Sequence, residues 1–353
     1  MTPPSNPYNY IVKSDIRLGG VPKYILANED EEFMAIPDNT RDCCCFIYYE
    51  NENKQRVLCG TAFFIAEVLG IDKNLARMTY SNVFLVTAKH LIDDIKLQYP
   101  NSPMGIRVNS ADGKTADIEI PFDVWFYHPT DSSVDAAILP WFNNEGLEIT
   151  TNPTYTAVTH DVIRKNGIGI GDEVFITGLF SEHYGRKRNL PIIRTGNIAM
   201  MPEDPVQTDY GLMMAYLIEL RSIGGLSGSP VYVHLQWADP KHKRTGHILY
   251  WLGMIHGHWN VGEETSIDIP IHDKGQQLNT GIGVVVPAYK ILEILDREEI
   301  MAMREESKHR FAKMKVPTKD SKIKSQQGIT QKEFFKVIDK ASQPVQENKD
   351  NQK

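Results

Sequence analysis

One serine, Ser227, lies in a run of small residues, GGLSGSP, at positions 224–230. Hydrolysis of a peptide or ester by a serine needs a hydroxyl that attacks, a base that takes its proton and donors that stabilise the developing oxyanion. Small neighbours let a substrate carbonyl approach, and glycine allows backbone geometry that turns two amides toward one point. We therefore predict Ser227 as the nucleophile and the amides of Gly225 and Ser227 as the oxyanion hole. The alternative is an ordinary glycine–serine turn between strands.

A histidine and an aspartate elsewhere in the chain complete this chemistry. His90 ends the apolar segment 82–90, a buried strand running into a short turn, where a general base is well placed. Asp135 directly precedes the apolar run AAIL, and orienting an imidazole would satisfy a carboxylate that is costly to bury. Each residue has a structural alternative, a half-buried histidine or a strand-start aspartate, and Asp131 competes for the acid role. The order His, Asp, Ser is that of chymotrypsin and predicts a catalytic triad.

Short strand patterns separated by turns fill most of the chain and predict an all-β protein. They form two groups of similar size, so we predict a first β-barrel at 41–150 and a second at 151–288. Apolar residues recur at helical spacing in 289–316, which predicts a C-terminal helix. We interpret 1–40 as an N-terminal extension. The Lys-rich segment 317–353 is predicted to be a charged, partly disordered tail.

Composition and cysteine usage limit the class of protein. With 353 residues, 41% of them hydrophobic, the chain can bury a sizeable core, and its net charge of −7 gives no general attraction to nucleic acid or membrane. No apolar run reaches the roughly 18–20 residues that a membrane span needs. We see no signal peptide, and the adjacent Cys43, Cys44 and Cys45 cannot easily pair with one another. Together with Cys59 they predict free thiols and a cytoplasmic location.

The motifs together resemble those of the trypsin-like (chymotrypsin-fold) serine peptidases, in their intracellular or bacterial form, from about residue 45 to 295. The matching segments are GTAFFI with VTAKHL, VDAAIL, GDEVFITG, IIRTGNI, GGLSGSPVY, LGMIHG and NTGIGVVVP. The resemblance implies a chymotrypsin-like double β-barrel with the active site between the barrels. Lys89 replaces the usual small residue before the histidine, and an ammonium near His90 would depress the imidazole pKa. Leu226 replaces the acid that activated trypsins use to bind a new N-terminus, so we expect no activation of that kind.

The same resemblance implies a substrate pocket around three basic residues. Arg221 falls at the base of the pocket, and His256 and His258 fall on the strand that forms its wall. Cationic or hydrogen-donating groups at these places would favour an acidic or amide side chain at the cleavage site. The alternative is that Arg221 faces solvent or pairs with a carboxylate.

Other kinds of site have weaker support in the sequence. His256 and His258 would share one face of a strand, as zinc ligands do, but no Cys-x-x-Cys spacing accompanies them. The glycine patterns at 167–171 and 281–283 run into strands rather than helices, so neither predicts a nucleotide site. We therefore predict no metal and no cofactor. We expect the Lys-rich tail to be solvated rather than bound to nucleic acid or to an acidic partner.

These observations predict a cofactor-free serine endopeptidase that acts on protein or peptide substrates through an acyl-enzyme intermediate. The first alternative is a latent or non-catalytic module of the same fold, which acts in protein–protein interaction or is controlled by a regulatory protein partner. The second is a structural protein whose tail mediates assembly. We expect neither a membrane nor a nucleic-acid partner.

Overall fold

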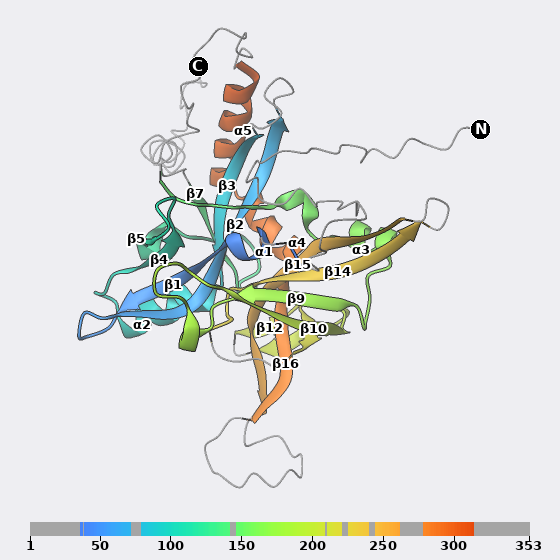
Figure 1. Ribbon diagram of the computed structural model, residues 1–353, viewed down its shortest axis with the longest axis horizontal. Helices are drawn as coiled ribbons and strands as arrows, with labels where there is room; N and C mark the ends of the chain where they lie inside the picture. The colour runs from blue at the N-terminus through green and yellow to red at the C-terminus, as the bar shows by residue number, and fades with distance from the viewer. Residues whose placement is uncertain are drawn as a thin grey trace, which may run out of the picture.

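The computed structural model describes residues 36–37, 39–71, 79–141, 146–208, 210–220, 225–239, 244–261 and 278–313 (Figure 1). The N-terminal extension up to residue 35 and the tail after residue 313 therefore lie outside the described residues, as does Arg221. None of the helices in the described ranges combines the length and the hydrophobicity that crossing a bilayer requires.

The first half of the chain forms an eight-stranded sheet. Its strands follow the order β5-β4-β1-β2-β3-β7-β6, and β8 pairs with β2. The neighbouring strands on this path are antiparallel, and only the short β8 runs parallel to its partner. The strand bounds are β1 Cys44–Glu50, β2 Arg56–Ile71, β3 Thr79–Thr87, β4 Met104–Asn109, β5 Thr115–Glu119, β6 Phe126–Tyr127, β7 Ala137–Trp141 and β8 Asn152–Pro153.

The second half forms a closed six-stranded barrel in the order β10-β13-β16-β15-β14-β9, with a separate hairpin of β11 and β12. The all-β class and the two successive β units of the chymotrypsin-like double barrel are thereby confirmed. The bounds are β9 Glu173–Gly178, β10 Ile192–Met200, β11 Val206–Thr208, β12 Gly211–Met213, β13 Tyr216–Glu219, β14 Pro230–Asp239, β15 Arg244–Val261 and β16 Leu278–Pro287.

Short helical segments connect the strands. The longest of these connections is α2 (Lys89–Gln98), which follows β3 directly, although the sequence pattern predicts only a short turn there. The helix forms because Leu91, Ile92 and Ile95 make an apolar face that is buried against the sheet. The other segments are α1 Asn39–Asp42, η1 Phe122–Val124, η2 Thr154–Thr156, α3 His160–Asn166 and η3 Ser181–His183.

The predicted C-terminal helix is present as three successive segments, α4 (Ala288–Leu292), η4 (Glu293–Asp296) and α5 (Glu298–Lys313). In Figure 1, α5 lies beside β2 and β3. The Arg304 guanidinium fixes it there by two hydrogen bonds to the Glu67 carboxylate of β2, at 2.8 and 2.6 Å. Helix α5 is therefore tied to the first sheet although it follows the second barrel in the chain.

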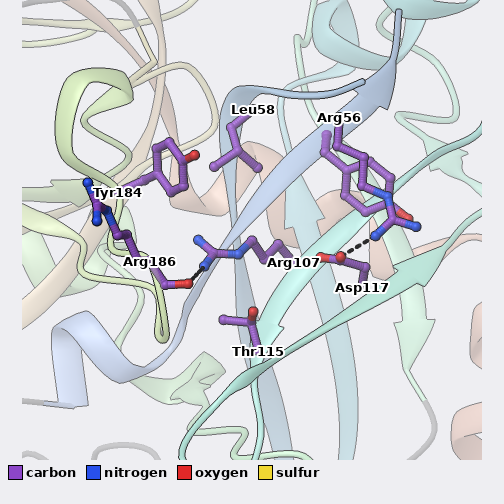
Figure 2. A pocket seen from close by; sticks show the side chains of 8 residues that line it. Arg56, Leu58, Arg107, Thr115, Asp117, Tyr184 and Arg186 are labelled. Carbon is purple, nitrogen blue, oxygen red and sulfur yellow. Dashed lines mark hydrogen bonds and ion pairs between the residues drawn. The ribbon is translucent and has the colours of Figure 1, made fainter. Parts of the chain in front are cut away.

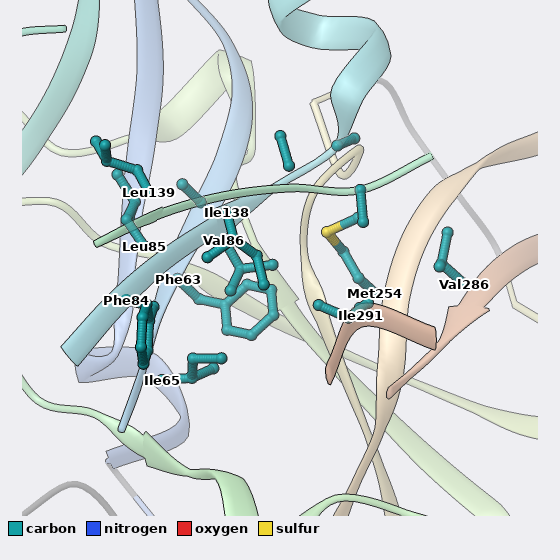
Figure 3. Packing of buried hydrophobic residues seen from close by; sticks show 14 of the residues in the cluster. Phe63, Ile65, Phe84, Leu85, Val86, Ile138, Leu139, Met254, Val286 and Ile291 are labelled. Carbon is teal, nitrogen blue, oxygen red and sulfur yellow. The ribbon is translucent and has the colours of Figure 1, made fainter. Parts of the chain in front are cut away.

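One hydrophobic cluster joins the two β units. It contains Phe63 of β2 and Trp251 of β15, whose rings meet edge to face with centroids 5.6 Å apart. Figure 3 shows Phe63 and other side chains of the first sheet together with Met254, Val286 and Ile291 from the second half. A smaller cluster fills the barrel itself. Because the two units share a core, side chains from both can be held at fixed distances from one another.

Candidate active site

The structure brings His90 and Asp135 together. His90 lies in the first turn of α2, and Asp135 lies in the loop that leads into β7. The Nδ1 atom of His90 is 2.7 Å from Oδ2 of Asp135, and the backbone amide of His90 donates to Oδ1 at 2.8 Å. Asp135 is 2% exposed, so this carboxylate is buried and both its oxygens are hydrogen-bonded. Its competitor Asp131 bonds Ser133 in its own loop instead.

Ser227 lies in the loop before β14, and a threonine of the first sheet anchors that loop. The Thr61 amide donates to Ser227 O at 2.9 Å, and its hydroxyl donates to Gly225 O at 3.2 Å. Gly228 has a φ of +82°, and a Cβ there would lie 2.0 Å from Thr61 O. Only glycine therefore lets the loop approach β2 this closely. The buried Ser229 hydroxyl adds a bond to Thr61 Oγ1 at 3.1 Å.

The backbone amides of Gly225 and Ser227 are the two donors that the sequence proposes for an oxyanion hole. Among the hydrogen bonds between described residues, neither amide donates to a protein acceptor. Gly225 has a φ of +96°, a left-handed conformation that favours glycine and sets the direction of the amides in this loop. Two unused amides beside a serine hydroxyl are the donors that an oxyanion needs.

The Ser227 hydroxyl is turned toward a backbone carbonyl. It donates to His256 O at 3.1 Å, and the described residues include no hydrogen bond between Ser227 Oγ and His90 Nε2. His90 can take the serine proton only after the hydroxyl turns away from His256 O. Catalytic hydrogen bonds are often loose before substrate binds, so this arrangement is compatible with a resting enzyme and also with a latent one.

A second imidazole shares the Asp135 carboxylate. His256 Nδ1 lies 2.6 Å from Oδ2 of Asp135, and His256 is 8% exposed. The sequence places His256 on the wall of the substrate pocket, but its ring is directed to Asp135 instead. The pairing of β15 with β16 shifts register between Ile255 and Gly257. This bulge breaks the alternation that would put the rings of His256 and His258 on one face, and no sequence spacing signals it.

The shared carboxylate sets the protonation of the site. Burial alone would raise the pKa of Asp135, but hydrogen bonds from His256 and His90 lower it to about 2. Burial also lowers the pKa of His90, and the bond and charge of Asp135 outweigh that effect and raise it. Because Asp135 is an ionised acceptor, each Nδ1 must carry a proton. Neutral His90 therefore presents an unprotonated Nε2, which is the tautomer that a general base requires.

His90, Asp135 and His256 also form a group whose ligand atoms lie within 4.8 Å of one another, as in a metal site. The two N···O separations of 2.6 and 2.7 Å are hydrogen-bond lengths. Two ligands of a tetrahedral zinc ion, each about 2.0 Å from the metal, lie about 3.3 Å apart. These separations therefore fit hydrogen bonds from both imidazoles to the Asp135 carboxylate better than shared ligation of a zinc ion.

Two further side chains surround the histidines. Tyr210, in the turn between β11 and β12, stacks on His90 with ring centroids 5.7 Å apart and meets His256 edge to face at 5.5 Å. No motif marks Tyr210 in the sequence. Lys89 is directed away from His90, with Nζ 4.0 Å from Asp93 Oδ2 and 5.7 Å from the centre of the Tyr127 ring. The depressed His90 pKa expected from a nearby ammonium is therefore not found.

No family model matches the sequence, and neither does any curated protein. The similar solved structures include the protease domain of MamO from Magnetospirillum magneticum, with 10% identity over 60% of this chain and 93% of that chain. They also include an inactive serine-to-alanine mutant of Rv3671c from M. tuberculosis, with 17% identity over 74% of this chain and 88% of that chain. Both TM-scores are 0.36, so the activity of this chain must be argued from its own residues.

The substrate-pocket role predicted for His258 stays a prediction. It is half-buried in β15, and burial, followed by the charges of Arg194 and His256, lowers its pKa. A neutral imidazole at the pocket would act as a hydrogen-bond donor or acceptor rather than as a fixed cation.

Proposed function

We propose that this protein is a serine endopeptidase with His90 as general base, Asp135 as the residue that orients it and Ser227 as nucleophile. The observation that carries the proposal is the buried Asp135 carboxylate, which holds Nδ1 of His90 at 2.7 Å and leaves Nε2 unprotonated. The Ser227 loop is anchored to the same sheet through Thr61.

The proposed reaction proceeds in two stages. Ser227 Oγ attacks the scissile carbonyl carbon while its proton moves to His90 Nε2, and the amides of Gly225 and Ser227 stabilise the oxyanion. His90 then gives the proton to the leaving amine, and an acyl-enzyme remains on Ser227. A water, deprotonated by His90, releases the acid product and restores the serine. Throughout, Asp135 stays ionised and stabilises the imidazolium.

A latent or non-catalytic module is the second proposal, and one observation favours it. The Ser227 hydroxyl bonds the carbonyl of His256 and not His90. A partner protein or substrate that occupies His256 O would free the hydroxyl for His90. The two proposals therefore differ in whether the isolated chain reacts.

Reaction of the isolated chain with a fluorophosphonate probe, read by intact mass, distinguishes them. The peptidase proposal expects one adduct on wild type and none on Ser227→Ala. His90→Ala, which keeps the nucleophile but removes its base, should react slower by orders of magnitude. No adduct on a folded wild type supports the latent module. An equal adduct on Ser227→Ala would exclude Ser227 as the nucleophile.

We also propose that the protein has a reducing, cytoplasmic location. The four cysteines are free in the structure, which supports the location. Titration of the denatured, unreduced protein should find four thiols, and a value near zero would contradict this location.

We further propose a preference for acidic or amide side chains in the substrate, carried by His258 and Arg221. Cleavage of a peptide library by wild type and by His258→Ala, scored for the residue before the cut, tests this preference.

A further inference from the structure

A second polar site lies on the first sheet, outside the candidate active site. A cavity of about 350 Å³ is bordered by strands β1, β2, β4 and β5 and by the turn that follows η3 (Figure 2). Three arginines and one aspartate contribute to its lining, together with an apolar and an aromatic side chain: Arg56, Arg107, Arg186, Asp117, Leu58 and Tyr184. The volume is that of a small-molecule site.

The central arginine is buried and forms no ion pair with another described residue. Arg107 is 9% exposed, and its Nη2 donates to the carbonyls of Gly185 and Arg186 at 2.9 and 3.3 Å. Its Cζ lies 5.2 Å from the centre of the Tyr184 ring. Nη1 is buried with no hydrogen-bond partner, and burial lowers the pKa of this guanidinium. A buried charge in this condition is costly unless an anion approaches it.

The other charges of the cavity do not neutralise Arg107. Asp117 stands opposite Arg107 in the sheet, but its carboxylate pairs with Arg56, which Glu50 also approaches at 3.6 Å. Within the part of the chain that the structure describes, neither Arg107 nor Arg186 forms an ion pair. Arg56 thus takes the nearby carboxylates, and Arg107 and Arg186 contribute two positive charges to the cavity, in a chain whose net charge is −7.

The cavity is held in shape before any ligand binds. The Asn189 side chain donates to Arg107 O at 2.6 Å, and the Asn189 backbone amide donates to Asn109 Oδ1 of β4 at 2.7 Å. Arg188 of the same turn pairs with Glu148 at 2.5 Å. The turn with Tyr184 and Arg186 is therefore fixed to the sheet, and a ligand would not have to order it.

We propose that this cavity binds a small organic phosphate monoester. A phosphate monoester carries close to two negative charges at neutral pH, which matches the two unpaired guanidinium charges. Arginine forks bind phosphate oxygens in a bidentate manner, and the Thr115 hydroxyl adds a donor. The volume exceeds what phosphate alone fills, so the organic group would lie against Leu58 and the Tyr184 ring.

The test is calorimetric titration of the full chain at low salt with phenyl phosphate. We expect saturable binding with a dissociation constant of about 1 mM or tighter. Arg107→Met and Arg186→Ala should each weaken binding by about 10-fold, the loss of one charge-assisted hydrogen bond. Arg186 is exposed, so its replacement tests the site even if Arg107→Met fails to fold. Lys187→Ala removes a positive charge from the same turn at an exposed residue that does not line the cavity, and should change binding less than about 2-fold.

Three further probes define the ligand. Inorganic phosphate should bind more weakly than phenyl phosphate, and benzoate should bind more weakly still. A phosphoserine or phosphotyrosine peptide that binds as tightly as phenyl phosphate would identify a phosphorylated side chain as the source, and weaker binding of both peptides would identify a free phosphate monoester. The proposal is overturned if phenyl phosphate gives no saturable heat up to about 10 mM, if Lys187→Ala weakens binding as much as Arg186→Ala, or if phosphate and phenyl phosphate bind equally. None of these outcomes depends on peptidase activity.

Discussion

Asp135 and Arg107 are two charged side chains with 2% and 9% exposure, and their surroundings differ. Asp135 receives hydrogen bonds from the His90 amide and from the rings of His90 and His256. Arg107 meets two carbonyls and an aromatic face, and one of its terminal nitrogens has no partner. A buried charge that the protein satisfies completely serves to orient its partners, whereas one that it leaves unsatisfied beside a cavity is suited to an external ion.

The largest expected effect is a loss of turnover when the buried Asp135 carboxylate is replaced. Asp135→Asn should lower turnover of a small ester by about 10⁴-fold, because an amide no longer selects the His90 tautomer with a free Nε2. Asp131→Asn is the matched control, four residues earlier in the same loop, and should alter turnover by no more than a few fold. Equal losses in the two variants would show that the loop, and not the carboxylate on His90, determines the rate.

The second effect compares stability at the two sites. Asp135→Ala leaves three buried donors without an acceptor and should lower the free energy of unfolding by about 3–5 kcal/mol. Arg107→Met removes a charge that forms no ion pair with another described residue, so its cost should be less than half of that. Urea denaturation of both variants measures the difference. A larger loss in Arg107→Met would mean that the guanidinium is already compensated, and the comparison between the sites would fail.

The third effect concerns acid unfolding. The pKa of Asp135 falls from 3.8 to about 2 on folding, so this group adds stability above pH 3.8 that is lost as the pH falls through about 2. The contribution is about 2 kcal/mol. Denaturation midpoints between pH 4 and pH 2 should fall more steeply in wild type than in Asp135→Asn. Parallel curves would show that the carboxylate titrates normally.

The smallest expected effect is on the pH dependence of activity, and it distinguishes the role of His90 from that of His256. The pKa of His90 is raised in the fold, and a base must be neutral, so the acid limb of the activity profile should lie above pH 6.5. His256→Ser removes the competing donor on Asp135 Oδ2 and should move that limb up further, by up to about one pH unit. His258→Ser, which leaves Asp135 untouched, should keep it in place. A downward shift in His256→Ser would contradict competition for the carboxylate.

The sequence by itself predicted the β class and the two successive β units, which the structure shows, and it proposed the three residues of the candidate triad. It did so because these signals are local: apolar runs end at His90 and begin after Asp135, and small residues surround Ser227. The conformation of the loop before Ser227 is local in the same sense, since the positive φ of Gly225 belongs to the glycine itself.

Only the tertiary structure decided what these residues touch. Helix α2 forms where the sequence predicts a turn, because packing of its apolar face outweighs the weak local preference. His256 reaches Asp135 through a bulge in β15, and Tyr210 reaches His90 from a distant hairpin. The arginine cavity joins four strands to a turn far along the chain. Such contacts depend on register and packing between remote segments, and residue spacing does not encode them.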